Sequence, residues 1–131
     1  MYSRIERMAL WGPQFIDVTW GAGGSTAEKT LGISTNAAKY LGVNVQMHLT
    51  CTNMPIEQFK NALETAKSSG IRNIFALRGD PPKGKDWEKI EGGFSYAVDL
   101  VKYIKKQYGD FFSIGVAGYP VIYFFFFIFV F

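Results

Sequence analysis

The sequence has little of several features that mark well-known classes of protein. It contains one cysteine, Cys51, and one histidine, His48, among 131 residues. One cysteine cannot form a disulfide within the chain, and no second cysteine or histidine stands at metal-ligand spacing. No charged and apolar leader follows Met1. We therefore expect no metal site and a reducing, cytoplasmic location.

The chain also has no large excess of positive or negative charge. The net charge is +3, and charged residues make up 19% of the chain. The densest basic group, Lys102, Lys105 and Lys106, lies near the end of an expected helix, where it complements the negative end of the helix dipole. This position favours a solvated helix face, so we expect no nucleic-acid partner.

Long apolar runs are absent except for "VIYFFFFIFVF", residues 121–131. The run spans about half of the ~20 residues that a membrane-spanning helix needs, so we expect no membrane anchor. As a strand it would be an aggregation hazard, because it carries no charge. Its residues are encoded by T-rich triplets. We interpret it as an aberrant tail, translated from a retained intron or a mispredicted gene end after Pro120.

The remaining sequence alternates between two kinds of segment. Four apolar, β-branched or aromatic runs have strand length, at 14–20, 43–49, 71–77 and 112–118. Three helical segments separate them, at 25–42, 55–70 and 94–109, and a partial helix at 2–12 precedes the first strand. Ser25 and Glu28 have capping-box spacing. The alternation predicts an α/β fold with a parallel sheet, and it fits a closed barrel and an open doubly wound sheet equally.

In either architecture, ligands bind at the carboxyl ends of the strands. The residues at those ends combine an acid, a guanidinium, an imidazole, hydroxyls and aromatic rings, which is typical of a ligand site. They are Thr19 and Trp20; His48, Leu49, Thr50 and Cys51; Arg78, Gly79 and Asp80; and Ala117, Gly118 and Tyr119.

Several of these residues also have structural interpretations. His48 fits a core histidine as well as a functional one, and Cys51 is better explained by packing. "GAGGST" at 21–26 follows a strand, but it lacks the glycine spacing of a dinucleotide fingerprint and the Gly-Lys-Ser/Thr of a phosphate loop. "RGD" at 78–80 follows a buried strand, where Gly79 allows close backbone approach to a ligand and Asp80 is a lone acid at the mouth of the sheet.

Five stretches, "DVTWGAGG", "HLTC", "ALRGDPP", "GGFSYAVDLV" and "VAGYP", together resemble one family, methylenetetrahydrofolate reductase of the eukaryotic type. The resemblance covers about residue 2 to residue 120. It implies an eight-stranded β/α (TIM) barrel with FAD at its carboxyl face, of which this chain would hold about four strands with outer helices. NAD(P)H would reduce the flavin, and the flavin would pass hydride to 5,10-methylenetetrahydrofolate, giving 5-methyltetrahydrofolate for methionine supply.

The resemblance also implies roles for residues of this chain. Asp80 would be catalytic, since a carboxylate near the flavin and the folate favours the cationic iminium form that accepts hydride. Arg78 would face the anionic diphosphate or hold Asp80 in place. The cofactor-binding residues would be Thr19, Trp20, His48, Arg78, Gly79, Asp80, Tyr96, Ala97, Ala117 and Tyr119.

The family pattern also extends beyond this sequence. It begins with an earlier strand that bears a glutamate, and it continues after Pro120 with further β/α units and, in eukaryotes, a regulatory domain. We expect residues 1–120 to form a partial flavin-binding barrel domain, 121–131 to be foreign to it, and family members to form homo-oligomers. The alternative is a catalytically inert fragment. An independent flavin or nucleotide module is less consistent, because its phosphate loop would be intact.

Overall fold

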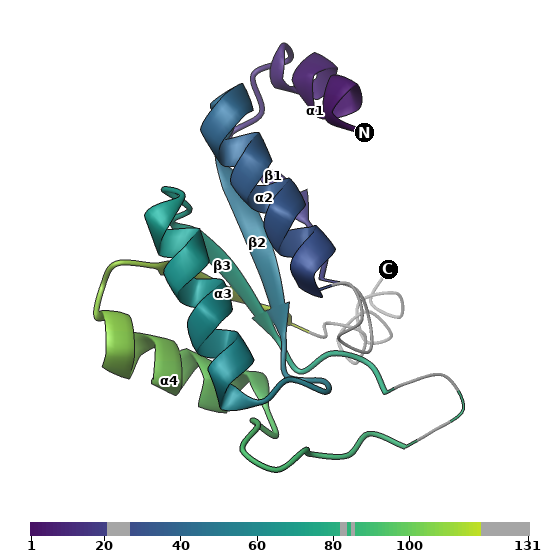
Figure 1. Ribbon diagram of the computed structural model, residues 1–131, viewed down its shortest axis with the longest axis vertical. Coiled ribbons are helices and arrows are strands. Elements are labelled where there is room, and N and C mark those ends of the chain that lie inside the picture. The colour runs from purple at the N-terminus through teal and green to yellow at the C-terminus, as the bar shows by residue number, and fades with distance from the viewer. Residues whose placement is uncertain (21–26, 82–83, 85, 119–131) are drawn as a thin grey trace, which may run out of the picture.

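Helices and strands alternate along the chain, as the sequence predicts (Figure 1). The structure is a computed structural model that describes residues 1–20, 27–81, 84 and 86–118. Its elements are α1 (Tyr2–Ala9), β1 (Ile16–Val18), α2 (Ala27–Leu41), β2 (Val45–Thr50), α3 (Ile56–Ser68), β3 (Asn73–Leu77), α4 (Ala97–Tyr108) and β4 (Ser113–Val116). The predicted capping box at Ser25 and the tail at 121–131 lie outside the described residues.

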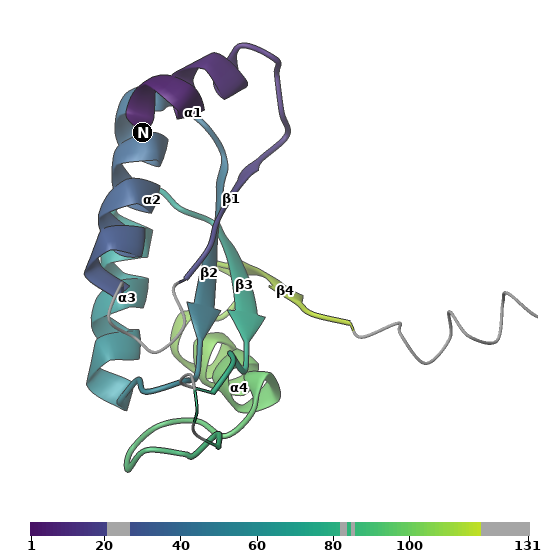
Figure 2. The same cartoon turned by 90° about the vertical axis from the view of Figure 1, so that its right-hand side faces the viewer.

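The four strands form one parallel sheet in the order β1-β2-β3-β4. This order follows the chain without reversal, and α2 and α3 lie on the same face of the sheet (Figure 2). A doubly wound sheet reverses its strand order and has helices on both faces, whereas a β/α barrel does neither. The architecture is therefore α/β and consistent with part of a β/α barrel.

Alternate strand residues point toward the helices and form the core, because successive side chains on a strand face opposite ways. We call this side of the sheet the covered face. On β1, β2 and β3 its buried residues are Ile16, Val18, Val45, Met47, Leu49, Ile74 and Ala76. The helices contribute apolar residues at helical spacing, including Phe59, Leu63 and Ala66 from α3 and Leu100 and Ile104 from α4.

The opposite side of the sheet has a different character. No helix within the described ranges covers it (Figure 2). We call it the open face. Its residues Asp17, Gln46, His48, Asn73 and Phe75 are half-buried or exposed, and they are polar or aromatic. The strands therefore hold their apolar residues on one side and their chemically active residues on the other.

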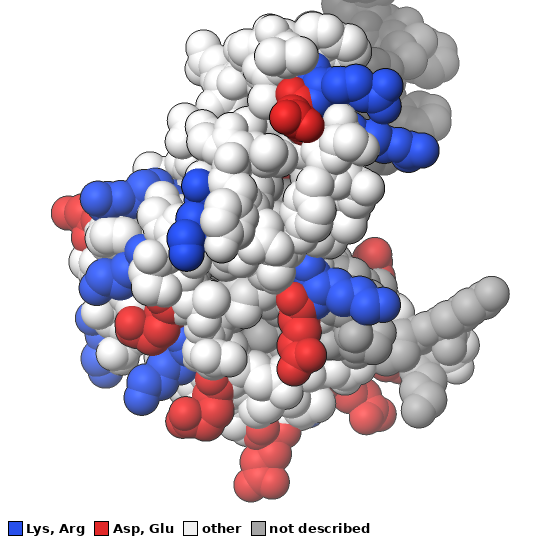
Figure 3. Space-filling view, turned by 45° about the horizontal axis from the view of Figure 1, so that its top comes forward, with Lys and Arg blue, Asp and Glu red and all other residues white. Residues whose placement is uncertain are grey.

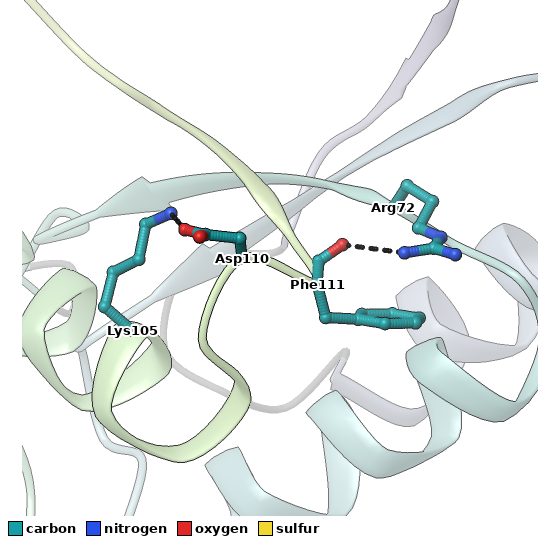
Figure 4. A network of polar contacts seen from close by, with 4 residues as sticks. All are labelled: Arg72, Lys105, Asp110 and Phe111. Carbon is teal, nitrogen blue, oxygen red and sulfur yellow. Dashed lines mark hydrogen bonds and ion pairs between the residues drawn. The ribbon is translucent and has the colours of Figure 1, made fainter.

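The connection from α4 to β4 is fixed by polar contacts at the amino end of the sheet (Figure 4). Lys105 Nζ lies 3.0 Å from Asp110 Oδ1, and Arg72 Nη1 donates to the carbonyl oxygen of Phe111 at 3.2 Å. The Arg72 guanidinium also lies 3.9 Å from the centre of the Phe111 ring. These contacts set where β4 begins, so its carboxyl end meets the same edge as the other strands.

The surface mixes charges of both signs on the face drawn in Figure 3, where basic and acidic side chains are interspersed. Such mixing is typical of a solvated surface. Among the described helices, none has the length and apolar character needed to cross a membrane.

Candidate functional site

The carboxyl ends of the four strands bring most of the predicted site residues to one edge of the sheet. Thr19 and Trp20 follow β1, the Arg78-Gly79-Asp80 turn follows β3, and Ala117 follows β4. His48 lies within β2, on the open face. Tyr119 lies outside the described residues.

His48 is held in place by two neighbours on the open face. Its Nε2 lies 3.1 Å from Asp17 Oδ1, and its ring centre lies 5.0 Å from that of Phe75. The imidazole is therefore fixed by an acid from β1 and a ring from β3. Because the Asp17 carboxylate accepts a hydrogen bond from Nε2–H, Nδ1 is the ring nitrogen available to a ligand.

The position of Phe75 depends on a glycine in the next strand. Phe75 pairs with Gly115 in the parallel register, and a Cβ added at Gly115 would lie 2.9 Å from Phe75 Cδ2. Real Cβ atoms do not approach so closely, so only glycine lets the Phe75 ring lie over β4 in this way. One side of the Phe75 ring thus faces His48, and the other packs against β4 at Gly115.

The Arg78-Gly79-Asp80 turn wraps around the hydroxyl of Thr52. Thr52 Oγ1 lies 3.1 Å from the carbonyl oxygens of both Arg78 and Asp80, to which its single hydrogen is donated. Gly79 has φ +82°, which an L side chain rarely adopts, and a Cβ there would lie 2.5 Å from Thr52 Oγ1. A glycine is required at this turn for both reasons.

The Arg78 side chain lies against two aromatic rings. Its guanidinium carbon is 4.3 Å from the centre of the Trp87 ring and 5.3 Å from that of Tyr96. Within the described ranges no ion pair joins Arg78 to Asp80, and both side chains are exposed. The guanidinium is thus oriented by aromatic contacts, and its N–H groups can bind an anion.

Tyr96 and Ala97 stand where the long β3–α4 connection meets α4. Tyr96 is the N-cap of α4, and its backbone N–H donates to Asp99 Oδ2 at 3.2 Å. The spacing of Tyr96, Leu100 and Tyr108 predicts that Tyr96 lies on a face of this helix, but Tyr96 precedes the helix and is 58% exposed. Its ring lies near the Arg78 guanidinium, which links the start of α4 to the β3 turn.

Trp20 is separated from the other site residues. Its side chain is 3% exposed and lines a hollow beside α2 and α3 with Leu31, Met54 and Ala62. The neighbouring Thr19 is exposed, and its carbonyl oxygen accepts from Thr30 Oγ1 at 3.1 Å. The indole therefore lies on the helix side of the sheet, and a ligand at the strand ends would meet Thr19 before Trp20.

Cys51 follows β2 and is buried. Burial, with a further contribution from the nearby Asp99 carboxylate, raises the pKa of its thiol to about 12, and the Arg78 cation opposes the shift. A thiol with such a pKa stays protonated at neutral pH and is a poor nucleophile. The described residues contain no group of three potential metal ligands.

Four residues of this site were missed in the sequence: Asp17, Phe75, Thr52 and Trp87. Asp17 and Phe75 each lie between two buried residues of a strand, so alternation alone could have placed them on the open face. Thr52 and Trp87 carry no such signal, because their contact spans the fold between β2 and the β3–α4 connection. Only the folded chain brings them together.

Comparison with known proteins identifies the family of the chain. Residues 1–124 match the family model "Methylenetetrahydrofolate reductase". The chain is 55% identical over 121 residues to "Methylenetetrahydrofolate reductase (NADH) 1" of Zea mays, covering 92% of this chain and 20% of that protein. It is 54% identical over 123 residues to "Methylenetetrahydrofolate reductase 2" of Saccharomyces cerevisiae, with the same coverage.

A more distant relative is "Probable methylenetetrahydrofolate reductase (NADPH)" of Caenorhabditis elegans, 39% identical over 123 residues that cover 90% of this chain and 18% of that protein. The chain thus spans about a fifth of the length of these curated relatives. The family match takes in all four strands and the described edge at which their carboxyl ends meet. The chain belongs to the methylenetetrahydrofolate reductase family.

Proposed function

We propose that this chain supplies part of an FAD site at the carboxyl edge of its sheet, in an enzyme that reduces 5,10-methylenetetrahydrofolate to 5-methyltetrahydrofolate with NAD(P)H. The observation that carries the proposal is the gathering of His48, the Arg78-Gly79-Asp80 turn and Tyr96 near one edge in a chain of this family. The product would supply methyl groups for methionine.

The residues of this edge fit the chemical needs of FAD. A diphosphate needs a cation and close backbone approach, and a flavin ring needs a flat, partly apolar surface with a few polar groups. Arg78 is an exposed cation with an oriented guanidinium, and Gly79 lets the turn that carries it pack closely on Thr52. His48 and Phe75 present two aromatic rings on the open face, with their centres 5.0 Å apart and their planes tilted by 44°.

The geometry supports a role for each of these residues within the proposal. FAD, when bound, supplies the hydride chemistry. Arg78 binds anionic oxygens through its paired N–H groups, which suit a phosphate. Asp80 is an exposed carboxylate beside that cation, where it stabilises positive charge on the folate and favours the iminium form. His48, held by Asp17, offers Nδ1 to the ligand.

FAD binding and catalytic turnover of the folate are separate parts of the proposal, because the chain spans about 20% of the length of these two relatives. The alternative is that the chain is catalytically inert by itself. We place the activity in the cytoplasm and expect homo-oligomers. NAD(P)H and the folate are the substrates of the proposed enzyme.

The test is to purify the 131-residue chain, titrate it with FAD and record the visible absorbance after gel filtration. We expect a stoichiometric flavin spectrum for the wild type and a weakened one for Arg78→Gln. Lys105→Gln is the charge-matched control, since Lys105 pairs with Asp110 at the other end of the sheet. A folded, colourless wild-type chain refutes the flavin site. Bound flavin without NAD(P)H-dependent folate reduction supports the inert alternative.

A further inference from the structure

The hydroxyl of Thr52 has three polar partners in the interior of the site. Thr52 is 1% exposed, and its Oγ1 contacts the carbonyl oxygens of Arg78 and Asp80. It also accepts a hydrogen bond of 3.0 Å from Trp87 Nε1. One donor shared between two carbonyls and one accepted N–H use the capacity of a hydroxyl well. A buried hydroxyl that makes all of these hydrogen bonds restricts the movement of the groups that it contacts.

The first thing that Thr52 fixes is the backbone of the turn. Both flanking carbonyls of Gly79 are held by the same oxygen, and Gly79 itself rests against that oxygen. The turn therefore has little freedom to rotate its peptide groups. Thr52 therefore sets the directions in which the side chains of Arg78 and Asp80 leave the turn. These side chains are the cation and the acid of the candidate site.

The second thing that Thr52 fixes is the plane of the Trp87 ring. An indole with its N–H bound is held at one edge, and its face is then presented to the Arg78 guanidinium at 4.3 Å. Trp87 comes from the β3–α4 connection and lies in no helix or strand. Within the described part of the chain, the hydrogen bond to Thr52 is the polar contact that ties this ring to the sheet.

We propose that Thr52 and Trp87 are positioning residues for the anion-binding part of the site: Thr52 fixes the Arg78-Gly79-Asp80 turn and the Trp87 ring, and Trp87 holds the Arg78 guanidinium in the orientation that receives phosphate oxygens. This inference rests on the proposed function for the identity of the ligand. The contacts themselves exist without a ligand, so they can be tested separately.

The first experiment tests the contact in the ligand-free chain by NMR. The chain has three tryptophans, Trp11, Trp20 and Trp87. Trp87→Phe assigns the Trp87 indole proton. We expect Thr52→Val, which keeps the shape of the side chain, to speed solvent exchange of this proton about tenfold, because its acceptor is lost. Thr52→Ser restores the acceptor and should leave exchange within about twofold of the wild type. Unchanged exchange in Thr52→Val overturns the proposal.

The second experiment measures FAD affinity by fluorescence quenching. We expect Thr52→Val to raise Kd about tenfold and Thr52→Ser to leave it within about twofold. A loss of affinity that Thr52→Ser does not rescue overturns the role of the hydroxyl. Near-ultraviolet circular dichroism establishes that each variant is folded.

The third experiment tests the stacking of the Trp87 ring on the Arg78 guanidinium and leaves Thr52 unchanged. Trp87→Phe keeps a flat ring and lacks the N–H, whereas Trp87→Leu lacks both. We expect Trp87→Leu to bind FAD about fivefold more weakly than Trp87→Phe when Arg78 is present. In the Arg78→Gln background the two should agree within about twofold, because the ring acts through the guanidinium. An equal difference in both backgrounds overturns that role.

These arms separate the two proposals. If the wild-type chain binds no FAD, the proposed function fails, and the exchange of the Trp87 indole still decides whether Thr52 holds Trp87. If the wild type binds FAD and the Thr52→Val and Trp87→Leu variants bind it equally well, the flavin site stands and the positioning role is refuted.

Discussion

The same strands form both faces of the sheet, but the covered face packs against the helices and the open face carries candidate site residues. On β2, Met47 and Leu49 are fully buried against the helices, while His48 between them faces the other way and contacts Asp17 and Phe75. Alternation lets a single strand hold the fold with one set of residues and a ligand site with the other. Substitutions on the covered face should therefore cost stability, and those on the open face should cost binding.

The largest expected effect is on the covered face. Leu49→Ala removes a fully buried side chain near the carboxyl end of β2 and should lower the free energy of unfolding by about 3 kcal/mol, measured by urea denaturation. The control is His48→Ala, the preceding residue on the open face, which should lower it by less than about 1 kcal/mol. Equal losses from the two would contradict the division between the faces.

The next effect is at the Arg78-Gly79-Asp80 turn. Gly79→Ala adds a Cβ that meets Thr52 Oγ1 and places alanine at φ +82°, so we expect a loss of about 2 to 3 kcal/mol. Gly84→Ala is a matched control, because Gly84 has φ +77° but nothing within 4 Å of the added atom. It should cost about 1 kcal/mol. Denaturation that gives the same loss for both would exclude a steric role for Thr52.

Crowding on the open face should have a smaller cost. Gly115→Ala brings a Cβ to 2.9 Å from Phe75 and should lower stability by about 1 to 2 kcal/mol. Adding Phe75→Leu should recover part of that loss, because a smaller side chain leaves room for the methyl group. Strictly additive losses in the double variant would indicate that the two residues do not touch.

Alkaline pH tests the buried thiol. Because the pKa of Cys51 is raised to about 12 in the folded chain from 9.0, unfolding releases a proton above pH 9 and stability falls as the pH rises toward 12. Below pH 9 this contribution is fully present. Between pH 8 and pH 10 under reducing conditions, the wild type should lose about 1 kcal/mol more than Cys51→Ala. Parallel profiles would show that the thiol titrates normally in the folded chain.

The smallest expected effect on stability is at the exposed acid of the open face. Asp17→Ala should change the free energy of unfolding by less than about 1 kcal/mol, because the side chain is 47% exposed. FAD affinity should still fall about threefold, since His48 loses the group that orients its ring. Gln46→Ala, a neighbouring open-face change, is the control. A large loss of stability with unchanged affinity would reverse the assignment of this pair.

The sequence predicted much of this arrangement. The strand-like runs at 43–49 and 71–77 contain most of β2 and β3. The expected helices at 25–42 and 55–70 each close on a glycine, and both Gly42 and Gly70 have the positive φ typical of a residue just after a helix. The run at 14–20 was too long, since β1 covers only Ile16–Val18 and Phe15 beyond it is 48% exposed. Apolar composition marks a strand but does not mark where pairing stops.

The site was harder to predict than the fold for a physical reason. Strand ends are local features, so Thr19 and Arg78 could be placed at one edge from periodicity alone. The burial of Trp20 on the helix side and the contact of Thr52 with Trp87 depend on packing between distant segments, which no local pattern encodes. Candidate ligand-binding residues were therefore easier to identify from the sequence than the residues that position their side chains.

The contact of Phe75 with Gly115 also has a consequence for how this family varies. A mutation that enlarges residue 115 is harmful while residue 75 is aromatic, and it becomes tolerable only after residue 75 has become smaller. The order of the two changes during descent is therefore constrained. In a comparison of many relatives we expect the two positions to covary, with glycine retained at 115 wherever an aromatic ring occupies 75.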